Sequence, residues 1–241
     1  NLPLLTYHGT SLEELLEPQM REDFYHFEGN AQALRLVTRL HYLVDEHGMN
    51  LTYALLNTII KYPGSSMEIN EKSSNIKDRK MGYYYADEDI FRKVTEETGA
   101  GRNRHPLAYI LEAADDLAYK TADIEDAFVK GFIRYGDLER ELEVLEEKMP
   151  DCLFRPVSRL RSFYDRGTKK QVHNPESYAV KNWIVNAQGF LLNCATEGFM
   201  SNYDEIMAGE FENDLFYGTK GEFLMELLGD MAYRYVFSSM A

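Results

Sequence analysis

The stretch HPLAYILEAADDLAYKTADIEDAFVKG, residues 105–131, constrains the fold more than any other part of the chain. Pro106 suits the first position of a helix, because that residue needs no amide donor there. At 100° per residue the remaining side chains separate into two faces. The apolar face holds Leu107, Ile110, Leu111, Ala114, Leu117 and Ala118, and the polar face holds Glu112, Asp115, Asp116, Tyr119, Asp123 and Asp126. The sequence predicts a long helix with one apolar and one acidic side.

Helical periodicity continues through nearly the whole chain, and no strand-like alternation stands out. Proline or glycine marks the boundaries of several segments, and a stripe of Val180, Trp183, Ile184, Ala187, Leu191 and Cys194 follows Pro175. We therefore predict an all-α fold of about nine helices, with residues 1–241 as a single helical region. The predicted helices include 29–48, ending at Gly48, then 50–64, 87–99, 136–150 and 156–167.

Composition narrows the class of protein. Hydrophobic residues make up 44% of the chain, which is typical of a globular domain. No apolar run reaches the roughly 18–20 residues that a membrane span needs. The two cysteines, Cys152 and Cys194, form no zinc motif and no disulfide framework, so we expect a reducing, cytoplasmic setting. A net charge of −14 argues against a general nucleic-acid surface but allows a local basic pocket.

The acids of 112–126 have two readings. One is an ordinary solvated helix face. The other is a ligand site, because mid-helix aspartates and like-charge neighbours destabilise a helix. Asp115, Tyr119 and Asp123 follow each other at i, i+4 and i+8, so a carboxylate, an aromatic ring and a second acceptor lie along one face. Acids grouped in this way suit a cation or a set of hydroxyl groups.

Basic residues gather near tyrosines at residues 61–64, KYPG, and 77–85, KDRKMGYYY. Lys61, Lys77, Arg79 and Lys80 either form an anion pocket or belong to an ordinary solvated loop. The polar segment 65–85 is long for a loop within a compact domain, and such loops are often functional. In HFEGNAQALRL, residues 26–36, Asn30 is a candidate helix cap.

Four segments together resemble the bacterial deoxyguanosine triphosphate triphosphohydrolases of the HD-domain superfamily. They are HFEGNAQALRL, the KY at 61–62, the KMGYY at 80–84 and HPLAYILEAADDLAYKTADIEDA. YRYVFS near the end of the sequence continues the pattern weakly. The resemblance implies part of an HD-domain-like helical bundle. It also implies hydrolysis of dGTP, or of dNTPs more broadly, to deoxynucleoside and tripolyphosphate. The implied cofactor is a divalent transition metal, with Mn, Mg, Co, Fe and Ni as candidates.

The resemblance assigns roles to individual residues of this chain. Asp115 matches a metal ligand, Tyr119 the ring under the deoxyribose, and Asp123 the acceptor of the sugar 3′-hydroxyl. Positions that line the nucleotide and triphosphate match Asn30, Lys61, Tyr62 and Lys80, and Phe237 matches an aromatic residue near the base. Family behaviour also implies a homo-oligomer and a single-stranded DNA effector as partners.

The chain departs from the family in one important respect. It contains no His-Asp dipeptide, and the motif with the family's catalytic histidine and glutamate is missing, so no catalytic residue is assigned. We expect a central fragment of such an enzyme, inactive on its own. The alternative is a catalytically inactive, HD-derived module that binds nucleotides or nucleic acid.

Overall fold

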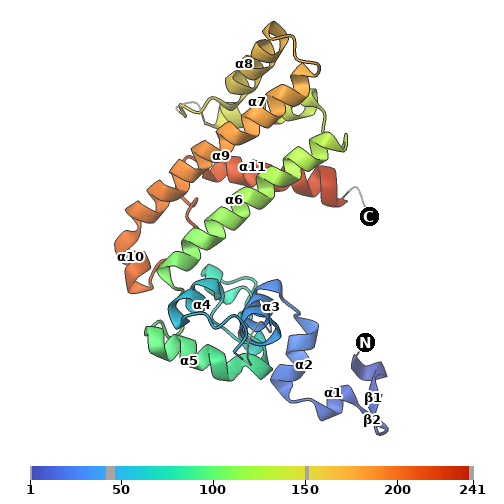
Figure 1. Cartoon of the computed structure of the whole chain (residues 1–241), viewed down its shortest axis with the longest axis vertical. Helices are drawn as coiled ribbons and strands as arrows, with labels where there is room; N and C mark the ends of the chain where they lie inside the picture. Colours follow the sequence, from blue (N-terminus) through green and yellow to red (C-terminus); the bar gives the residue numbers. More distant parts are fainter. Residues whose placement is uncertain (1, 42–46, 150–151, 239–241) are drawn as a thin grey trace. The chain divides into compact units, whose positions relative to one another are not determined.

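The computed structural model describes residues 2–41, 47–149 and 152–238, and the chain is all-α apart from one two-stranded hairpin in these ranges. The fold class predicted from periodicity is confirmed. Packing divides the chain into two compact units (Figure 1). Unit 1 comprises Asn1–Leu111 and Asn202–Asp214, and unit 2 comprises Glu112–Ser201 and Leu215–Ala241. The prediction that residues 1–241 act as one helical region stays a prediction.

Unit 1 consists of short helices and turns joined by long irregular segments. In chain order its elements are η1 (Leu2–Leu4), β1 (Thr6–Tyr7), β2 (Thr10–Ser11), α1 (Leu12–Leu15), α2 (Pro18–Tyr25), α3 (Gly29–Arg35), η2 (Leu36–Leu40), α4 (Tyr53–Ile59), η3 (Ser66–Glu68), η4 (Ile76–Asp78), η5 (Tyr85–Asp87), α5 (Glu88–Thr98) and α10 (Tyr203–Ala208). The hairpin pairs Thr6 with Ser11 and Tyr7 with Thr10. Its strands are too short for the alternation that a sequence pattern could reveal.

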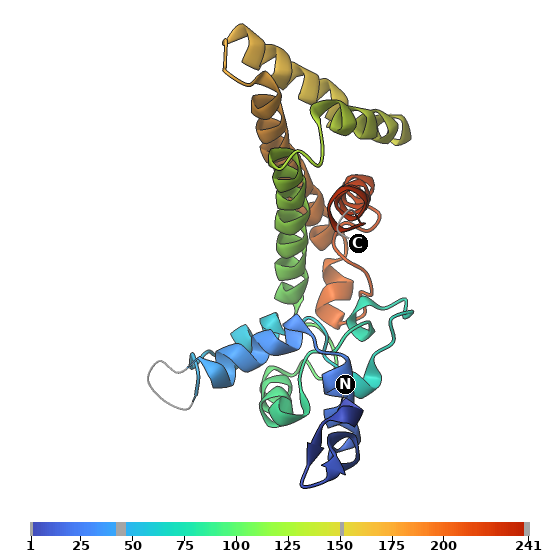
Figure 2. The same ribbon diagram turned by 90° about the vertical axis from the view of Figure 1, so that its right-hand side faces the viewer.

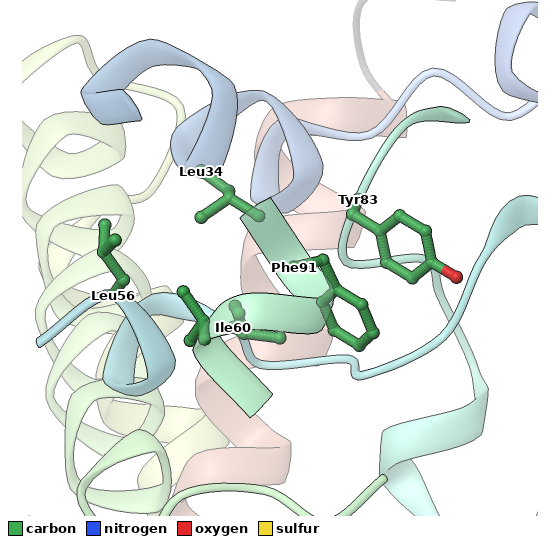
Figure 3. Packing of buried hydrophobic residues seen from close by; sticks show 6 residues of the cluster. Leu34, Leu56, Ile60, Tyr83 and Phe91 are labelled. Carbon is green, nitrogen blue, oxygen red and sulfur yellow. The ribbon is translucent and has the colours of Figure 1, made fainter. Parts of the chain in front are cut away.

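The core of unit 1 joins α3, α4 and α5. Figure 3 shows the side chains of Leu34, Leu56, Ile60 and Phe91, which belong to one buried cluster, with the Tyr83 ring beside Phe91. The two rings stack with centroids 4.0 Å apart. Tyr83 is therefore a core residue, and the end of the 65–85 segment is tied to the helices.

Unit 2 contains the long helices of the chain. α6 (Pro106–Val129) begins in unit 1 and continues into unit 2, where it is followed by α7 (Tyr135–Lys148), α8 (Pro156–Lys169), α9 (Pro175–Ser201), α11 (Glu222–Ala232) and η6 (Tyr233–Phe237). Figures 1 and 2 show α6 and α9 alongside each other. Gln188 Nε2 donates to Thr121 Oγ1 at 2.8 Å, and Lys181 Nζ lies 3.8 Å from Glu125 Oε1, so the two helices run antiparallel.

The stripe predicted on α9 is confirmed, since all six of its residues are buried. Trp183 is fully buried, and its indole N–H donates to the Pro156 carbonyl oxygen at 3.0 Å. This bond satisfies the one polar atom of the ring and fixes the start of α8 against α9.

The start of α6 at Pro106 is also confirmed, but the predicted apolar face is wrong. Leu107 and Ile110 are 50% and 44% exposed, whereas Thr121 and Ile124 are fully buried. Glu112, expected on the polar face, is buried as well. Periodicity identifies the faces of a helix, but the neighbouring elements decide which face is covered.

The helix predicted over 29–48 is shorter than expected. It is regular over α3, widens into the π-helical turn η2, and ends at Leu40, while residues 42–46 lie outside the described residues. The chain then returns to the same helix, because Met49 N–H donates to the Val37 carbonyl oxygen at 2.8 Å. Gly48 has a φ of +62°, and an added Cβ would lie 2.3 Å from that oxygen. Glycine serves here as the turn that allows this return rather than as a helix end.

Three of the remaining predicted helices lie close to α5, α7 and α8, whereas the helix predicted over 50–64 is limited to α4 and ends at Ile59, before Pro63. The predicted end of one helix at Pro150 lies outside the described residues. None of the described helices combines the length and the apolar composition that a membrane-spanning segment requires.

Candidate functional site

Glu28 organises the first group of candidate residues, at the start of α3. Its carboxylate accepts from the Asn30 backbone N–H at 3.3 Å and from Asn30 Nδ2 at 2.6 Å. Glu28 is therefore the cap of α3, and the reading of Asn30 as the cap is wrong. The same bonds fix the orientation of the Asn30 side chain.

Lys80 and Tyr62 join this group. Lys80 Nζ lies 3.7 Å from Glu28 Oε2 and 5.8 Å from the centroid of the Tyr62 ring. A cation at this distance from an aromatic face is attracted to it. Asn30 and Lys80, which are far apart in the sequence, thus meet at the Glu28 carboxylate, and the Tyr62 ring lies near Lys80.

A small buried cluster fixes the backbone next to Asn30 and Lys80. Ala31, Met81 and Tyr84 pack together, and each of the first two is the sequence neighbour of a candidate residue, Asn30 or Lys80. The Tyr84 hydroxyl donates to the Glu28 carbonyl oxygen at 3.1 Å. The packing of apolar neighbours therefore fixes the backbone from which the polar side chains project.

Gly82 allows the two basic segments to lie against each other. A Cβ at this position would be 1.9 Å from the Tyr62 carbonyl oxygen, so only glycine fits without a backbone shift. Gly82 N–H donates to the Gly64 carbonyl oxygen at 2.9 Å, which ties KMGYY to KYPG. Lys61, half-buried, precedes Tyr62 in the same segment.

Arg104 is a member of this group that the sequence pattern did not reveal. Its side chain is almost fully buried, with the residue 3% exposed. The guanidinium carbon lies 5.9 Å from the Tyr62 ring and 4.5 Å from the Tyr109 ring. Arginine is rarely buried, so its burial here indicates a specific role. In the sequence, the only sign of this residue was the second base of RNRHP, directly before α6.

The other two bases of the predicted pocket stabilise the loop instead. Lys77 Nζ donates to Asn103 Oδ1 at 3.3 Å, and Arg79 Nε donates to the Ser73 carbonyl oxygen at 3.0 Å. The structure thus favours the interpretation of Lys77 and Arg79 as ordinary loop residues. Lys61 and Lys80 remain candidates for contact with an anion.

The second group lies along α6 in unit 2. Asp115 and Tyr119 are exposed, and Tyr119 is 58% exposed despite its large ring. Asp123 is half-buried, and within the described part of the chain no donor reaches its buried Oδ2. Burial, and then the carboxylate of Asp126, raise the pKa of Asp123 above its usual range.

Two nearby acids on α6 are partly compensated by basic side chains. Glu125 forms an ion pair with Lys181, and Asp126 Oδ2 lies 3.9 Å from Lys130 Nζ. Glu125 and Asp126 therefore belong to an ordinary solvated helix surface. Asp123 differs from them in having a buried oxygen that accepts no bond from the described residues.

Phe237 is the last residue of η6, and its ring is 46% exposed. The turn is held to α7, since Arg234 Nη1 lies 2.8 Å from Glu141 Oε1 and the Tyr235 hydroxyl lies 3.3 Å from the same oxygen. The hydrogen bond from Arg234 holds the pKa of Glu141 below its usual value. An exposed aromatic ring on an anchored turn is suited to contact with a ligand.

Asp115 does not form a metal site with its described neighbours. No group of three or more His, Cys, Asp or Glu side chains that could hold a metal ion occurs in residues 2–41, 47–149 and 152–238. Transition-metal sites that catalyse hydrolysis hold the ion with about three protein ligands. The described residues therefore do not, by themselves, fit the implied metal.

Comparison with known proteins gives a consistent family. The chain is 43% identical over 240 residues to a deoxyguanosinetriphosphate triphosphohydrolase-like protein of Listeria monocytogenes. The aligned region covers 98% of this chain and 50% of that protein. It is 32% identical to a deoxyguanosinetriphosphate triphosphohydrolase of Yersinia enterocolitica, over 95% of this chain and 45% of that protein. The chain belongs to the deoxyguanosinetriphosphate triphosphohydrolase-like family. No protein-family model matches it.

This triphosphohydrolase-like chain spans about half the length of the curated relatives it matches. Its eight assigned residues fall into two sets. Asn30, Lys61, Tyr62 and Lys80 belong to unit 1, and Asp115, Tyr119, Asp123 and Phe237 belong to unit 2. Their individual roles stay predictions.

Proposed function

We propose that a protein of the relatives' full length hydrolyses dGTP, or dNTPs more broadly, to deoxynucleoside and tripolyphosphate, and that this chain supplies much of the substrate site. The family assignment supports the reaction class. Asp123 supports the substrate class most directly, because its buried Oδ2 needs a donor that the described residues do not provide. A sugar hydroxyl is a donor of the right kind.

Tyr119 and Asp123 would recognise the sugar. They are one helical turn apart on α6, so a ring and an acceptor lie on the same face. The exposed Tyr119 ring would pack under the deoxyribose and leave no room for a 2′-hydroxyl. Asp123 would accept from the 3′-hydroxyl, and Phe237 would contact the base.

The basic and aromatic group around Glu28 would bind the triphosphate. Lys61 and Lys80 would offset its negative charge, and Asn30 and Tyr62 would orient it. Arg104, buried and near the Tyr62 and Tyr109 rings, adds a further cation. The negative charge that builds up on the leaving tripolyphosphate is the charge that these cations would stabilise.

Metal dependence rests on the resemblance alone. A divalent metal would polarise a phosphate oxygen and activate water when bound. Asp115 would be one ligand of that metal.

Binding of dGTP and GTP to the chain tests the sugar site by calorimetry. We expect dGTP to bind at least about tenfold more tightly than GTP, and we expect Tyr119→Ala to bring the ratio close to one. Tyr7→Ala is the matched control, because Tyr7 is 63% exposed and carries no assigned role. Equal affinities for dGTP and GTP in the unmutated chain would argue against the proposal.

Product analysis tests the reaction. Anion-exchange chromatography of dGTP incubated with Mn²⁺ separates tripolyphosphate from pyrophosphate and phosphate. We expect tripolyphosphate from the full-length protein and none from residues 1–241 alone. Binding without tripolyphosphate release in the full-length protein would favour the alternative, an inactive nucleotide-binding module.

A further inference from the structure

A cavity of about 460 Å³ lies in unit 2, between the start of α8 and the middle of α9. None of the eight assigned residues lines it. The volume is within the range of sites that bind small organic molecules. Its wall includes an aromatic pair, two cations and the buried amide of Asn186, and each of these features limits what could bind.

The aromatic part of the wall is rigid. Phe154, just before α8, stacks on Phe190 of α9 with ring centroids 4.4 Å apart and an interplanar angle of 9°. Phe154 is also near Trp183, at 6.4 Å between centroids, and is itself buried. A planar apolar ligand could pack against this pair without a change in the protein.

Two cations line the same cavity, Arg159 on α8 and Lys220 before α11. Arg159 Nε donates to the Phe154 carbonyl oxygen at 2.6 Å, and its guanidinium carbon lies 5.5 Å from the Phe154 ring. This arrangement fixes the guanidinium and leaves its outer nitrogens for another acceptor. No acidic residue is among the described lining residues, although the protein as a whole carries a net charge of −14.

Asn186 supplies the third feature. It lines the cavity from α9, and its buried Oδ1 accepts no hydrogen bond from the described residues. A buried carbonyl oxygen of this kind is normally paired. A ligand with an N–H or O–H group would complete it.

We propose that this cavity binds a small aromatic anion. Its ring packs against Phe154 and Phe190, its carboxylate or phosphate group binds Arg159 and Lys220, and an N–H or O–H group donates to Asn186. An arginine recognises carboxylate and phosphate groups by the same charge and geometry. An experiment with one probe of each kind therefore decides which group binds.

Ligand-observed NMR and calorimetry on the full chain 1–241 test the proposal with four probes: 4-hydroxybenzoate, 4-hydroxyphenyl phosphate, the neutral 4-hydroxybenzyl alcohol and inorganic phosphate. We expect at least one aromatic anion to bind at least about tenfold more tightly than either the neutral alcohol or phosphate alone. The tighter of the two aromatic anions identifies the anionic group.

Three variants locate the binding. Arg159→Gln and Lys220→Gln should each weaken binding about tenfold. Gly189→Leu should abolish it by filling the cavity, and it should fold normally, because Gly189 lies within α9 and an added Cβ there has no atom within 4 Å. Thermal unfolding of each variant checks that the fold is intact.

Arg166→Gln is the matched control. Arg166 is also on α8 and also lies over a phenylalanine, with its guanidinium carbon 5.3 Å from the Phe163 ring, but it does not line the cavity. Its affinity should equal that of the unmutated chain. The proposal is overturned if no aromatic anion binds at about 10 mM, if the neutral alcohol binds equally well, or if Gly189→Leu binds as tightly as the control.

Discussion

Asp123 shows at the level of one residue how a site can reduce stability. A surface aspartate would be solvated and would have an ordinary pKa. Here burial and Asp126 raise the pKa of Asp123, which means that the folded protein disfavours the ionised form. An acceptor kept unpaired in the free protein costs stability, and such costs are found where function needs the group.

We predict that Asp123→Asn stabilises the free chain at pH 7 by on the order of 1 kcal/mol, because it removes a partly buried charge. The same change should weaken binding of dGTP. Since the folded pKa is raised, the folded protein holds the proton more tightly than the unfolded chain does. The unmutated chain therefore loses stability as pH rises above about 3.8 toward the raised pKa, and the variant should not show this part of the loss.

Urea unfolding at several pH values measures this difference. Asp165→Asn is the control, since Asp165 is an exposed aspartate on another helix, α8, and it should change stability by only about a few tenths of a kcal/mol. A destabilised Asp123→Asn would show that the carboxylate has a structural partner, and the sugar contact would lose its main support.

At the scale of one element, the start of α6 is stabilised by a side chain that lies just outside the helix. His105, the residue before Pro106, accepts the Leu107 backbone N–H on its Nδ1 at 3.2 Å, and this nitrogen also lies 3.4 Å from Thr58 Oγ1. An imidazole thus satisfies one of the free donors at the start of the helix, a role that Ser, Thr, Asp or Asn usually fills. Only the neutral ring can accept in this way.

We predict a pH-dependent loss of stability from this cap. Burial lowers the pKa of His105 below its usual 6.5, so the unfolded chain takes up the proton first. Stability should fall as pH drops below about 6.5. His105→Asn keeps an acceptor that does not titrate, and it should remove that part of the loss.

Chemical unfolding of both chains at pH 7.5 and 5.5 measures the effect as a difference of differences, which cancels the contribution of the other five histidines. His173→Asn is the control, because His173 precedes α9 without a role at its cap, where Asn174 accepts from Ser177 N–H at 2.9 Å. Equal pH dependence for the unmutated chain and His105→Asn would show that the imidazole is not the cap.

At the scale of the whole molecule, each unit has its own core. Unit 1 is built around Leu34, Leu56 and Phe91, and unit 2 around the α9 stripe with Trp183. Both cysteines belong to unit 2 and are buried. Burial also raises the pKa of the Cys194 thiol to about 11, so little thiolate forms at neutral pH.

We predict that neither Cys152 nor Cys194 reacts with iodoacetamide in the folded chain at pH 7.5, because both side chains are buried and Cys194 in addition forms little thiolate. Labelling in increasing urea, followed by mass spectrometry, should report the unfolding of unit 2. The fully denatured chain is the control and should take up two labels. Rapid labelling of one cysteine under native conditions would show that its side of unit 2 opens locally.

The sequence by itself determined the helical class of the fold and the chemistry of its local motifs. Helical periodicity, Pro106 and the spacing of Asp115, Tyr119 and Asp123 are local properties, since the helix repeat alone puts these three side chains on one face. The motifs identified the family for the same reason, because a motif is a local pattern.

Only the tertiary structure decided which groups meet and which face is covered. Glu28 joins Asn30 to Lys80, and Gly82 lets one basic segment touch the other. Arg104 lies near the rings of both Tyr62 and Tyr109. Likewise, α6 buries Thr121 and Ile124 instead of the face predicted to be apolar. The physical reason is that burial and pairing depend on segments distant in the sequence, whereas periodicity describes one segment at a time.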